Sequence, residues 1–176
     1  MTNQDISIRP MCKADIEILV RDYCAPWLPP QAVQERWKKY FAEQLQGIRT
    51  AAVIAKGQEI LGYGCLLLRS EYAHFSNIPE ICDVWIHENH RGLGLGKQLI
   101  AWLEELARKK GYAEIGIGVG LYADYGPAQK LYFKLGYTPD GHGVTYKYQP
   151  THAGTNYCLD DDLILWLKKS LPREVV

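Results

Sequence analysis

The pattern of hydrophobic and polar positions divides the chain into segments with two different periods. Runs in which apolar residues alternate with polar ones predict strands, and segments with apolar residues three or four positions apart predict amphipathic helices. The predicted strands are residues 6–8, 50–56, 60–69, 78–87, 114–120, 144–149 and 163–168. The predicted helices are residues 13–23, 31–46, 94–110 and 127–135. Because helices and strands interleave, the pattern predicts a mixed α/β fold.

Turn residues mark several boundaries between these segments. Residues 56–59, Lys-Gly-Gln-Glu, have the composition of a hairpin turn between two predicted strands. Gly47, Gly111 and Gly136 directly follow predicted helices, where a glycine commonly ends the helix. Of these helices, residues 94–110 are the most strongly amphipathic.

Composition and charge limit the function. The chain has 176 residues, and its 20 Lys plus Arg balance 20 Asp plus Glu, so its formal net charge is zero. This balance argues against nucleic-acid binding by counterion release and against a polybasic membrane anchor. No apolar run approaches the roughly 20 residues needed to span a bilayer, and no signal peptide is recognised at the N-terminus. We therefore expect one cytoplasmic domain over residues 1–176, with no nucleic-acid or membrane partner.

The cysteines and histidines show no metal-binding pattern. The five cysteines are scattered along the chain without a Cys-x-x-Cys pair, which argues against a disulfide scaffold and a zinc site. No group of His, Cys and carboxylate residues has the spacing of metal ligands, so no metal is expected.

The most informative segment is Arg-Gly-Leu-Gly-Leu-Gly-Lys at residues 91–97, between a predicted strand and a predicted helix. Glycines there let the backbone approach a ligand, and the helix that follows adds its positive end, so the segment suits a phosphate. A Walker A loop is excluded, because it needs Gly in place of Arg91 and Ser or Thr in place of Gln98. A dinucleotide fingerprint is excluded as well, because Lys97 or Leu99 stands where its last glycine is required.

What remains is Arg91-x-x-Gly94-x-Gly96, which resembles the pyrophosphate loop of the GCN5-related N-acetyltransferases (GNAT). Residues 89–96 are similar to motif A of that family, and residues 128–137, Ala-Gln-Lys-Leu-Tyr-Phe-Lys-Leu-Gly-Tyr, are similar to its motif B. The order of predicted elements also resembles the family's fold. The resemblance implies a mostly antiparallel central sheet of about six to seven strands flanked by four helices.

The resemblance implies acetyl-CoA as the acyl-donor cosubstrate. Backbone N–H groups of the strand before the loop would polarise the thioester carbonyl, and the loop would hold the pyrophosphate. The cofactor-binding residues implied are Val84, Trp85, Ile86, Arg91, Gly92, Leu93, Gly94, Leu95, Gly96, Lys97, Tyr125 and Ala128. The chain departs from the family at Tyr125, where many members have Asn.

Acetyl transfer to an amine also needs a proton donor for the departing thiolate and a neutral amine. The resemblance implies Tyr132, the tyrosine of motif B, as the acid, and packing between helix and sheet is its alternative role. Glu80 and Asp83 are candidate bases, and their odd separation places them on opposite faces of a regular strand. Glu80 stands six residues before Ile86, which resembles the catalytic glutamate of the histone-acetyltransferase branch. A solvated carboxylate at the strand edge is the alternative for both.

A second glycine series, Gly116, Gly118 and Gly120, alternates with apolar residues and leaves one strand face nearly bare. This predicts either room for the acyl-pantetheine arm or close packing of a helix on the sheet. Weaker candidates lie in loops, each with an exposed or structural alternative. They are His74, His142, His152 and Trp27 for the acceptor, His90 for the phosphate, and the aspartates 160–162 for a cationic amine or a charged turn.

Together these patterns predict an acyl-CoA N-acyltransferase that acts by direct attack of the amine in a ternary complex. Transfer of a longer acyl group, and a non-catalytic acyl-CoA sensor or interaction module, stay open as alternatives. The acceptor is a small-molecule or peptide amine of unspecified identity, because acceptor pockets in this fold are built from variable loops. Both a monomer and a homodimer fit the sequence.

Overall fold

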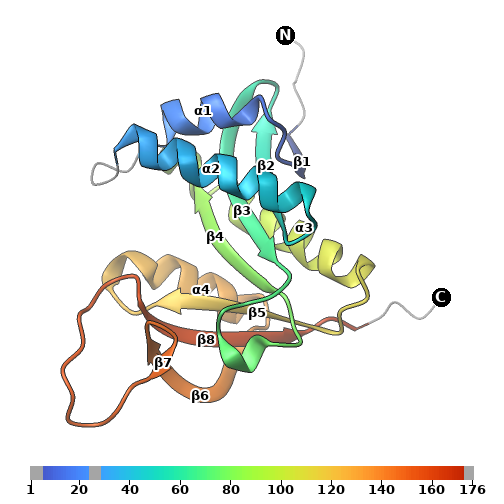
Figure 1. The fold of residues 1–176 in the computed structure, drawn as a ribbon. Coiled ribbons are helices and arrows are strands. Elements are labelled where there is room, and N and C mark those ends of the chain that lie inside the picture. Colours follow the sequence, from blue (N-terminus) through green and yellow to red (C-terminus); the bar gives the residue numbers. More distant parts are fainter. Residues whose placement is uncertain (1–5, 24–28, 173–176) are drawn as a thin grey trace. The chain divides into compact units, whose positions relative to one another are not determined.

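The structure is a computed structural model, and it describes residues 6–23 and 29–172. The chain divides into two units, Met1–Leu67 with Asp83–Leu103, and Leu68–Cys82 with Glu104–Val176. Strand β4 (Glu80–Ile86) and helix α3 (Leu95–Lys109) contribute residues to both units. Over the described residues there are eight strands, four α-helices and three short 3₁₀ helices (Figure 1).

The first unit contains a sheet whose strands are hydrogen-bonded in the order β1-β2-β3-β4. Its further elements are β1 (Ile6–Pro10), α1 (Asp15–Asp22), α2 (Pro30–Leu45), β2 (Arg49–Lys56), β3 (Glu59–Leu67) and the 3₁₀ helix η2 (Glu88–His90). The pairs β1–β2 and β2–β3 are antiparallel, and the hairpin turn at residues 57–58 joins β2 to β3.

Helices cover both faces of this sheet. Trp37 of α2 packs on Tyr63 of β3, with ring centroids 4.8 Å apart. A Cβ atom on the next residue, Gly64, would lie 3.2 Å from Leu99 and 3.3 Å from Leu103, both on α3. Because successive residues of a strand point to opposite faces, α2 and α3 lie on opposite sides of β3. Gly64 allows the close approach of α3.

The second unit contains strands hydrogen-bonded in the order β4-β5-β8-β6-β7. Its further elements are η1 (Ala73–Phe75), β5 (Glu114–Gly120), η3 (Ala123–Tyr125), α4 (Gly126–Lys134), β6 (Thr138–Tyr146), β7 (Gln149–Pro150) and β8 (Leu163–Ser170). β4 and β5 are parallel, whereas β5–β8, β6–β8 and β6–β7 are antiparallel. Tyr72, Phe75 and Trp166 form a buried aromatic cluster in this unit.

The mixed α/β class, the mostly antiparallel pairing and the four helices are confirmed. Each predicted helix overlaps an observed one, and Gly47, Gly111 and Gly136 have φ angles of +72°, +91° and +88°. These left-handed conformations end the helices as expected. Among the described residues, no helix has the length and apolar character that crossing a membrane requires.

The prediction of one strand over residues 144–149 is wrong, and this segment is a hairpin. Lys147 and Tyr148 adopt positive φ angles of +50° and +64° and turn the chain between β6 and β7. Neither residue type usually adopts this conformation, so the sequence contains no turn signal there. β6 also begins earlier, at Thr138, and its register on β8 shifts between Pro139 and Val144. The described part of the chain therefore has eight strands, where about six to seven were expected.

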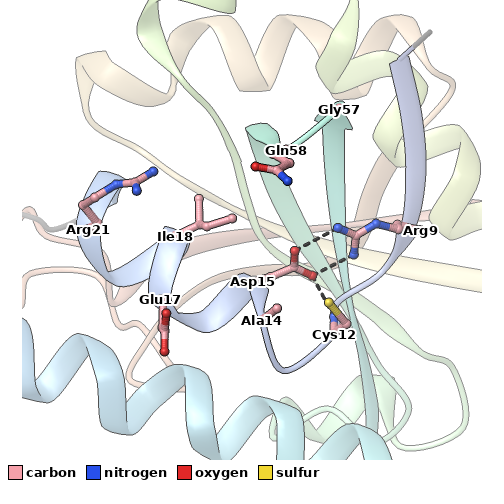
Figure 2. Close-up of a pocket in the computed structure, with 9 residues that line it drawn as sticks. All are labelled: Arg9, Cys12, Ala14, Asp15, Glu17, Ile18, Arg21, Gly57 and Gln58. Atoms are coloured by element: carbon pink, nitrogen blue, oxygen red, sulfur yellow. Dashed lines mark hydrogen bonds and ion pairs between the residues drawn. The ribbon is translucent and has the colours of Figure 1, made fainter. Parts of the chain in front are cut away.

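An ion pair fixes the start of α1 to β1. The Asp15 side chain is 4% exposed and accepts hydrogen bonds from Arg9 Nη1 at 2.7 Å and Nη2 at 2.8 Å. It also accepts the Cys12 N–H at 2.7 Å. Figure 2 shows this arrangement at a surface depression that Gln58 and Ile18 also line. Burial acts to raise the pKa of Asp15, but the hydrogen bonds from Arg9 and Cys12 outweigh it and hold the pKa below its ordinary 3.8.

Asp15→Asn should destabilise the fold by about 2 kcal/mol at neutral pH, because it removes charge-assisted hydrogen bonds from Arg9. The folded pKa of Asp15 is lower than the unfolded one, so its stabilisation is complete above the unfolded pKa and is lost as pH falls through the folded pKa. The stabilities of variant and wild type in urea unfolding should therefore converge as the pH falls below the ordinary 3.8 and through the folded pKa. As a control, Asp22→Asn removes an exposed pair with Arg21 and should change stability by less than about 0.5 kcal/mol. Equal effects of the two substitutions would contradict a special role for Asp15.

Candidate active site

The glycine loop lies between η2 and α3 in the first unit. Gly92 and Gly94 have φ angles of +78° and +77°, which residues with a Cβ atom rarely adopt. Both are exposed, and a Cβ built on either would meet no atom within 4 Å. Glycine is therefore needed here for backbone conformation, and the space beside the loop is open to a ligand.

The first turn of α3 offers backbone donors beside this space. The Gln98 N–H donates to the Gly94 carbonyl at 3.1 Å, which makes Gly94 the residue that caps the helix. The N–H groups of the three residues between them have no acceptor within the helix. They lie at the positive end of the helix dipole, an arrangement that suits a phosphate group.

Two side chains anchor the loop to the sheet. Leu95 is 3% exposed and packs with Ile54 and Leu61. The Arg91 Nε donates to the Ile86 carbonyl at 3.0 Å, and its guanidinium lies 5.7 Å from the centre of the Trp85 ring. Both ends of the loop are therefore held, although the side chains of Leu93 and Lys97 are exposed.

The end of β4 leads directly into this loop. The Val84 side chain lies beside Gly64 on the face that α3 covers, and Ile86 packs against the cluster that includes Leu95. Trp85 lies on the other face, where its ring contacts Tyr23 at 4.8 Å and Tyr63 at 5.8 Å between centroids. The three residues predicted to line the acyl group, 84–86, are thus half-buried and fixed on both sides.

Asp83, one candidate base, has a φ of +53° within β4. Regular alternation therefore does not extend through this residue, and the argument that separated Glu80 from Asp83 by strand face does not hold. The Asp83 carboxylate is exposed, accepts the Tyr40 hydroxyl at 2.9 Å and lies 3.8 Å from Arg49 Nη1. Burial, and then the negative charge of Asp83, raise the pKa of Tyr40.

Glu80, the other candidate base, belongs to the second unit and is 8% exposed. Its Oε2 accepts the Ser70 hydroxyl at 2.5 Å. Its backbone pairs with Gly116 of β5. Ser70 was not predicted, because it lies ten positions before Glu80 in a segment that forms no strand, and no spacing rule relates the two positions.

Tyr132, the candidate acid, lies on α4 and is 6% exposed. Burial raises its pKa to about 12, so the phenol remains protonated at neutral pH. Its ring centroid is 6.2 Å from that of Tyr137, the residue that follows Gly136 in motif B. A protonated, largely enclosed hydroxyl is available to act as a proton donor.

Tyr125 and Ala128 flank the start of α4. The Tyr125 ring lies against Gly120, where a Cβ atom would be only 2.5 Å from the ring. The hydroxyls of Tyr125 and Tyr122 both donate to Asp161 Oδ1, at 2.9 Å and 2.5 Å. Asp161 therefore binds two tyrosine hydroxyls at this turn. This gives one of the three consecutive aspartates at residues 160–162 a structural role. Ala128 is half-buried in the first turn of α4.

Side chains fill the bare face of β5. A Cβ atom on Gly116 would meet the Phe75 ring at 2.1 Å, and one on Gly118 would meet Ile164 and Trp166 at 2.9 Å and 3.0 Å. The occupants are thus mainly aromatic rings. This supports the interpretation as close packing, with aromatic side chains in place of the expected helix, and leaves no room for a pantetheine arm beside these two glycines.

The weaker candidates have mostly structural partners. His90 Nε2 lies 3.1 Å from Glu59 Oε1, and the rings of His74 and His142 stack at 3.5 Å. His152 is exposed, and the turn with Trp27 lies outside the described residues. Within 6–23 and 29–172, no group of three or more His, Cys, Asp and Glu residues is placed to hold a metal ion.

The fold and the glycine loop define an acyltransferase that uses an acyl-CoA donor. The profile of the acetyltransferase (GNAT) family matches residues 16–137, a stretch that includes the loop, both carboxylates and Tyr132. The chain therefore belongs to the GNAT acetyltransferase family, whose acyl donor is acetyl-CoA. No curated protein matches the chain.

Solved structures share the fold over nearly the whole chain. The yncA protein of Salmonella typhimurium, solved with its cofactor acetyl-CoA, has a TM-score of 0.66 and 22% identity over 98% of this chain and 97% of its own. An N-acetyltransferase from Staphylococcus aureus has a TM-score of 0.68 and 20% identity over 96% and 99%. The spermidine N-acetyltransferase of Vibrio cholerae, solved with CoA and spermine, has a TM-score of 0.66 and 15% identity over 96% and 97%. At these identities the likeness establishes the GNAT fold.

Gly94→Glu should abolish the binding of acetyl-CoA. The substitution places a carboxylate where the pyrophosphate would accept hydrogen bonds from backbone N–H groups. Gly111→Glu is a matched control, since Gly111 is exposed, has a φ of +91° and follows the other end of α3. Both variants carry a similar backbone strain of roughly 1–3 kcal/mol. Acetyl-CoA should raise the melting temperature of wild type and of Gly111→Glu, but not that of Gly94→Glu. Undiminished binding in a folded Gly94→Glu protein would refute this site.

Proposed function

We propose that this chain is an N-acetyltransferase that transfers the acetyl group of acetyl-CoA to a primary amine by direct attack in a ternary complex. The observation that carries the proposal is the loop at residues 91–97, where two left-handed glycines lie beside open space and the backbone N–H groups of the first turn of α3 have no acceptor within the helix. Family membership supplies the acyl donor. The acceptor is a small-molecule or peptide amine, and the Vibrio cholerae protein that shares this fold is described as a spermidine N-acetyltransferase.

The residues before and within the loop bind the donor. The N–H groups of the first turn of α3 receive the pyrophosphate, because they have no acceptor within the helix and carry the positive end of its dipole. Backbone N–H groups in 84–86 polarise the thioester carbonyl. Such donors are most effective when they are fixed in advance, and the contacts of Trp85 and the Arg91–Ile86 hydrogen bond fix this segment.

Tyr132 and Glu80 move the protons. As the amine nitrogen bonds to the acetyl carbon and the carbon–sulfur bond breaks, the Tyr132 hydroxyl gives its proton to the departing thiolate. Glu80 accepts the proton that the amine loses, through a water molecule. The raised pKa of Tyr132, about 12, keeps the acid protonated before the reaction. Tyr125 and Ala128 contribute to donor binding at the start of α4.

The two units act as one acetyltransferase domain in this proposal. The family profile spans residues 16–137 and thus includes parts of both units. β4 and α3 each contribute residues to both units. The donor-binding and proton-donating functions therefore belong to one functional domain.

Purified protein should release free thiol from acetyl-CoA when a suitable primary amine is added from a broad panel of polyamines, amino acids, aminoglycosides and peptides. Tyr132→Phe should retain acetyl-CoA affinity and lower kcat by about 10²–10⁴-fold, because only a proton donor is lost. Tyr137→Phe is the matched control, a second buried tyrosine in the same motif, and should keep the wild-type rate.

Binding of acetyl-CoA without thiol release across the whole panel would contradict the enzymatic proposal and favour an acyl-CoA sensor. Faster turnover with a longer acyl-CoA would change the assigned donor. A Tyr132→Phe protein with the wild-type rate, under conditions where chemistry limits turnover, would reduce Tyr132 to a packing role.

Glu80→Gln should lower kcat/KM most at low pH and recover in part as pH rises, because free amine then becomes abundant. Asp83→Asn should leave the acidic limb of the profile in place, since Asp83 is already engaged by Tyr40 and Arg49. The pH dependence of kcat/KM for both variants tests this assignment. A shifted acidic limb in Asp83→Asn, with none in Glu80→Gln, would reverse the two roles.

A further inference from the structure

Ser70 lies in the segment between β3 and β4 and contacts the candidate base directly. Its hydroxyl donates to Glu80 Oε2 at 2.5 Å. The same Ser70 oxygen accepts the backbone N–H of Tyr72 at 3.0 Å. A serine hydroxyl has one proton, and the Tyr72 N–H occupies an acceptor position, so this proton is directed at the carboxylate.

The segment that carries Ser70 is held in place by buried aromatic side chains. The Tyr72 ring stacks on Trp166 with centroids 4.2 Å apart, and its hydroxyl donates to Asp140 at 2.7 Å. Phe75 is 1% exposed and meets Trp166 edge-on at 5.3 Å. Such packing restricts the segment to one arrangement.

The segment that carries Ser70 and the strand that carries Glu80 both contact Gly116 of β5. The Phe75 ring fills the space above Gly116, and Glu80 pairs with Gly116 in the β4–β5 ladder. The Gly116 N–H also donates to the carbonyl of Pro79, the residue before Glu80, at 2.9 Å. The distance between the serine hydroxyl and the carboxylate is therefore set by rigid neighbours on both sides.

We propose that Ser70 is a positioning residue that holds the buried Glu80 carboxylate in its ionised, proton-accepting state. The proposal rests on the proposed function of Glu80 as the base. A hydrogen bond donated to a carboxylate favours its charged form, whereas burial opposes it. Ser70 supplies such a bond without adding a positive charge of its own.

Other titratable groups surround this pair. Tyr148, from the turn between β6 and β7, lies in the field of Glu80, Glu71, Cys82 and Asp162. Burial and the charges of these carboxylates raise its pKa to about 12, so it remains neutral between pH 5 and pH 9. His74, on the same segment as Ser70, stacks on His142 of β6 with ring centroids 3.5 Å apart. A His74→Gln variant is therefore needed to separate its contribution.

The test measures kcat/KM from pH 5 to pH 9 for Ser70→Ala, Ser70→Thr and Glu80→Gln. Ser70→Ala should move the midpoint of the acidic limb upward by about one pH unit, with up to about tenfold lower kcat/KM below it and convergence with wild type above it. Ser70→Thr should restore the wild-type profile, because it retains the hydroxyl. Ser76→Ala, at an exposed serine of the same segment, and His74→Gln should leave the midpoint in place.

A second readout does not depend on activity. In protein labelled with ¹³C at the glutamate carboxyl groups, the Glu80 signal is assigned as the one missing from Glu80→Gln. Its titration midpoint should move upward by about one pH unit in Ser70→Ala and return in Ser70→Thr.

The outcomes separate the two proposals. If Ser70→Ala leaves the Glu80 midpoint in place, or lowers kcat/KM equally at every pH, the role of Ser70 is refuted whatever Glu80 does. If the carboxyl signal shifts as expected but Glu80→Gln retains the wild-type acidic limb, Glu80 is not the base. In that case the catalytic purpose of Ser70 fails, although its effect on the carboxylate stands.

Discussion

The proposed donor site depends on one conformational constraint, since the backbone must twice enter the left-handed region before α3 begins. Gly92 and Gly94 satisfy it without steric cost, at φ near +78°. Because the helix starts immediately afterwards, its first N–H groups are exposed next to this turn. Glycine has a high conformational entropy when unfolded, so the loop needs anchors, and Leu95 and the Arg91–Ile86 hydrogen bond supply them. These contacts hold a glycine-rich segment in one conformation.

The glycines of β5 make room for other side chains of the protein, whereas the glycines of the loop lie beside open space. There Gly116 and Gly120 make room for the rings of Phe75 and Tyr125, and both glycines are buried. A glycine in a sequence indicates that a side chain is not tolerated, but it does not indicate whether solvent, ligand or protein occupies the space. In the loop the space is open and in the strand it is filled. The two glycine series can therefore be distinguished only when their neighbours from distant parts of the chain are known.

This difference explains how much of the fold and site the sequence could predict. Helix ends at Gly47, Gly111 and Gly136, the hairpin at residues 57–58 and the glycine loop all depend on residues within a few positions of each other. The turn at Lys147 and the positive φ of Asp83 are imposed by packing and pairing with distant segments, against the preferences of those residues. The contact between Ser70 and Glu80 also depends on distant segments, because the stacking of Tyr72 on Trp166 holds the segment that carries Ser70.

The two carboxylates of β4 differ in the kind of donor that holds them, and this difference bears on catalysis. Arg49 lies 3.8 Å from Asp83 and also pairs with Glu43, and its guanidinium covers the Tyr40 ring at 3.8 Å, so protonation of Asp83 would weaken a partly buried ion-pair network. Glu80 is held by a neutral hydroxyl, and protonating it breaks no ion pair with Ser70. A base must gain and lose a proton in each cycle, and the hydrogen bond from the Ser70 hydroxyl adds no positive charge that would oppose this. The surroundings, more than the position along the strand, favour Glu80.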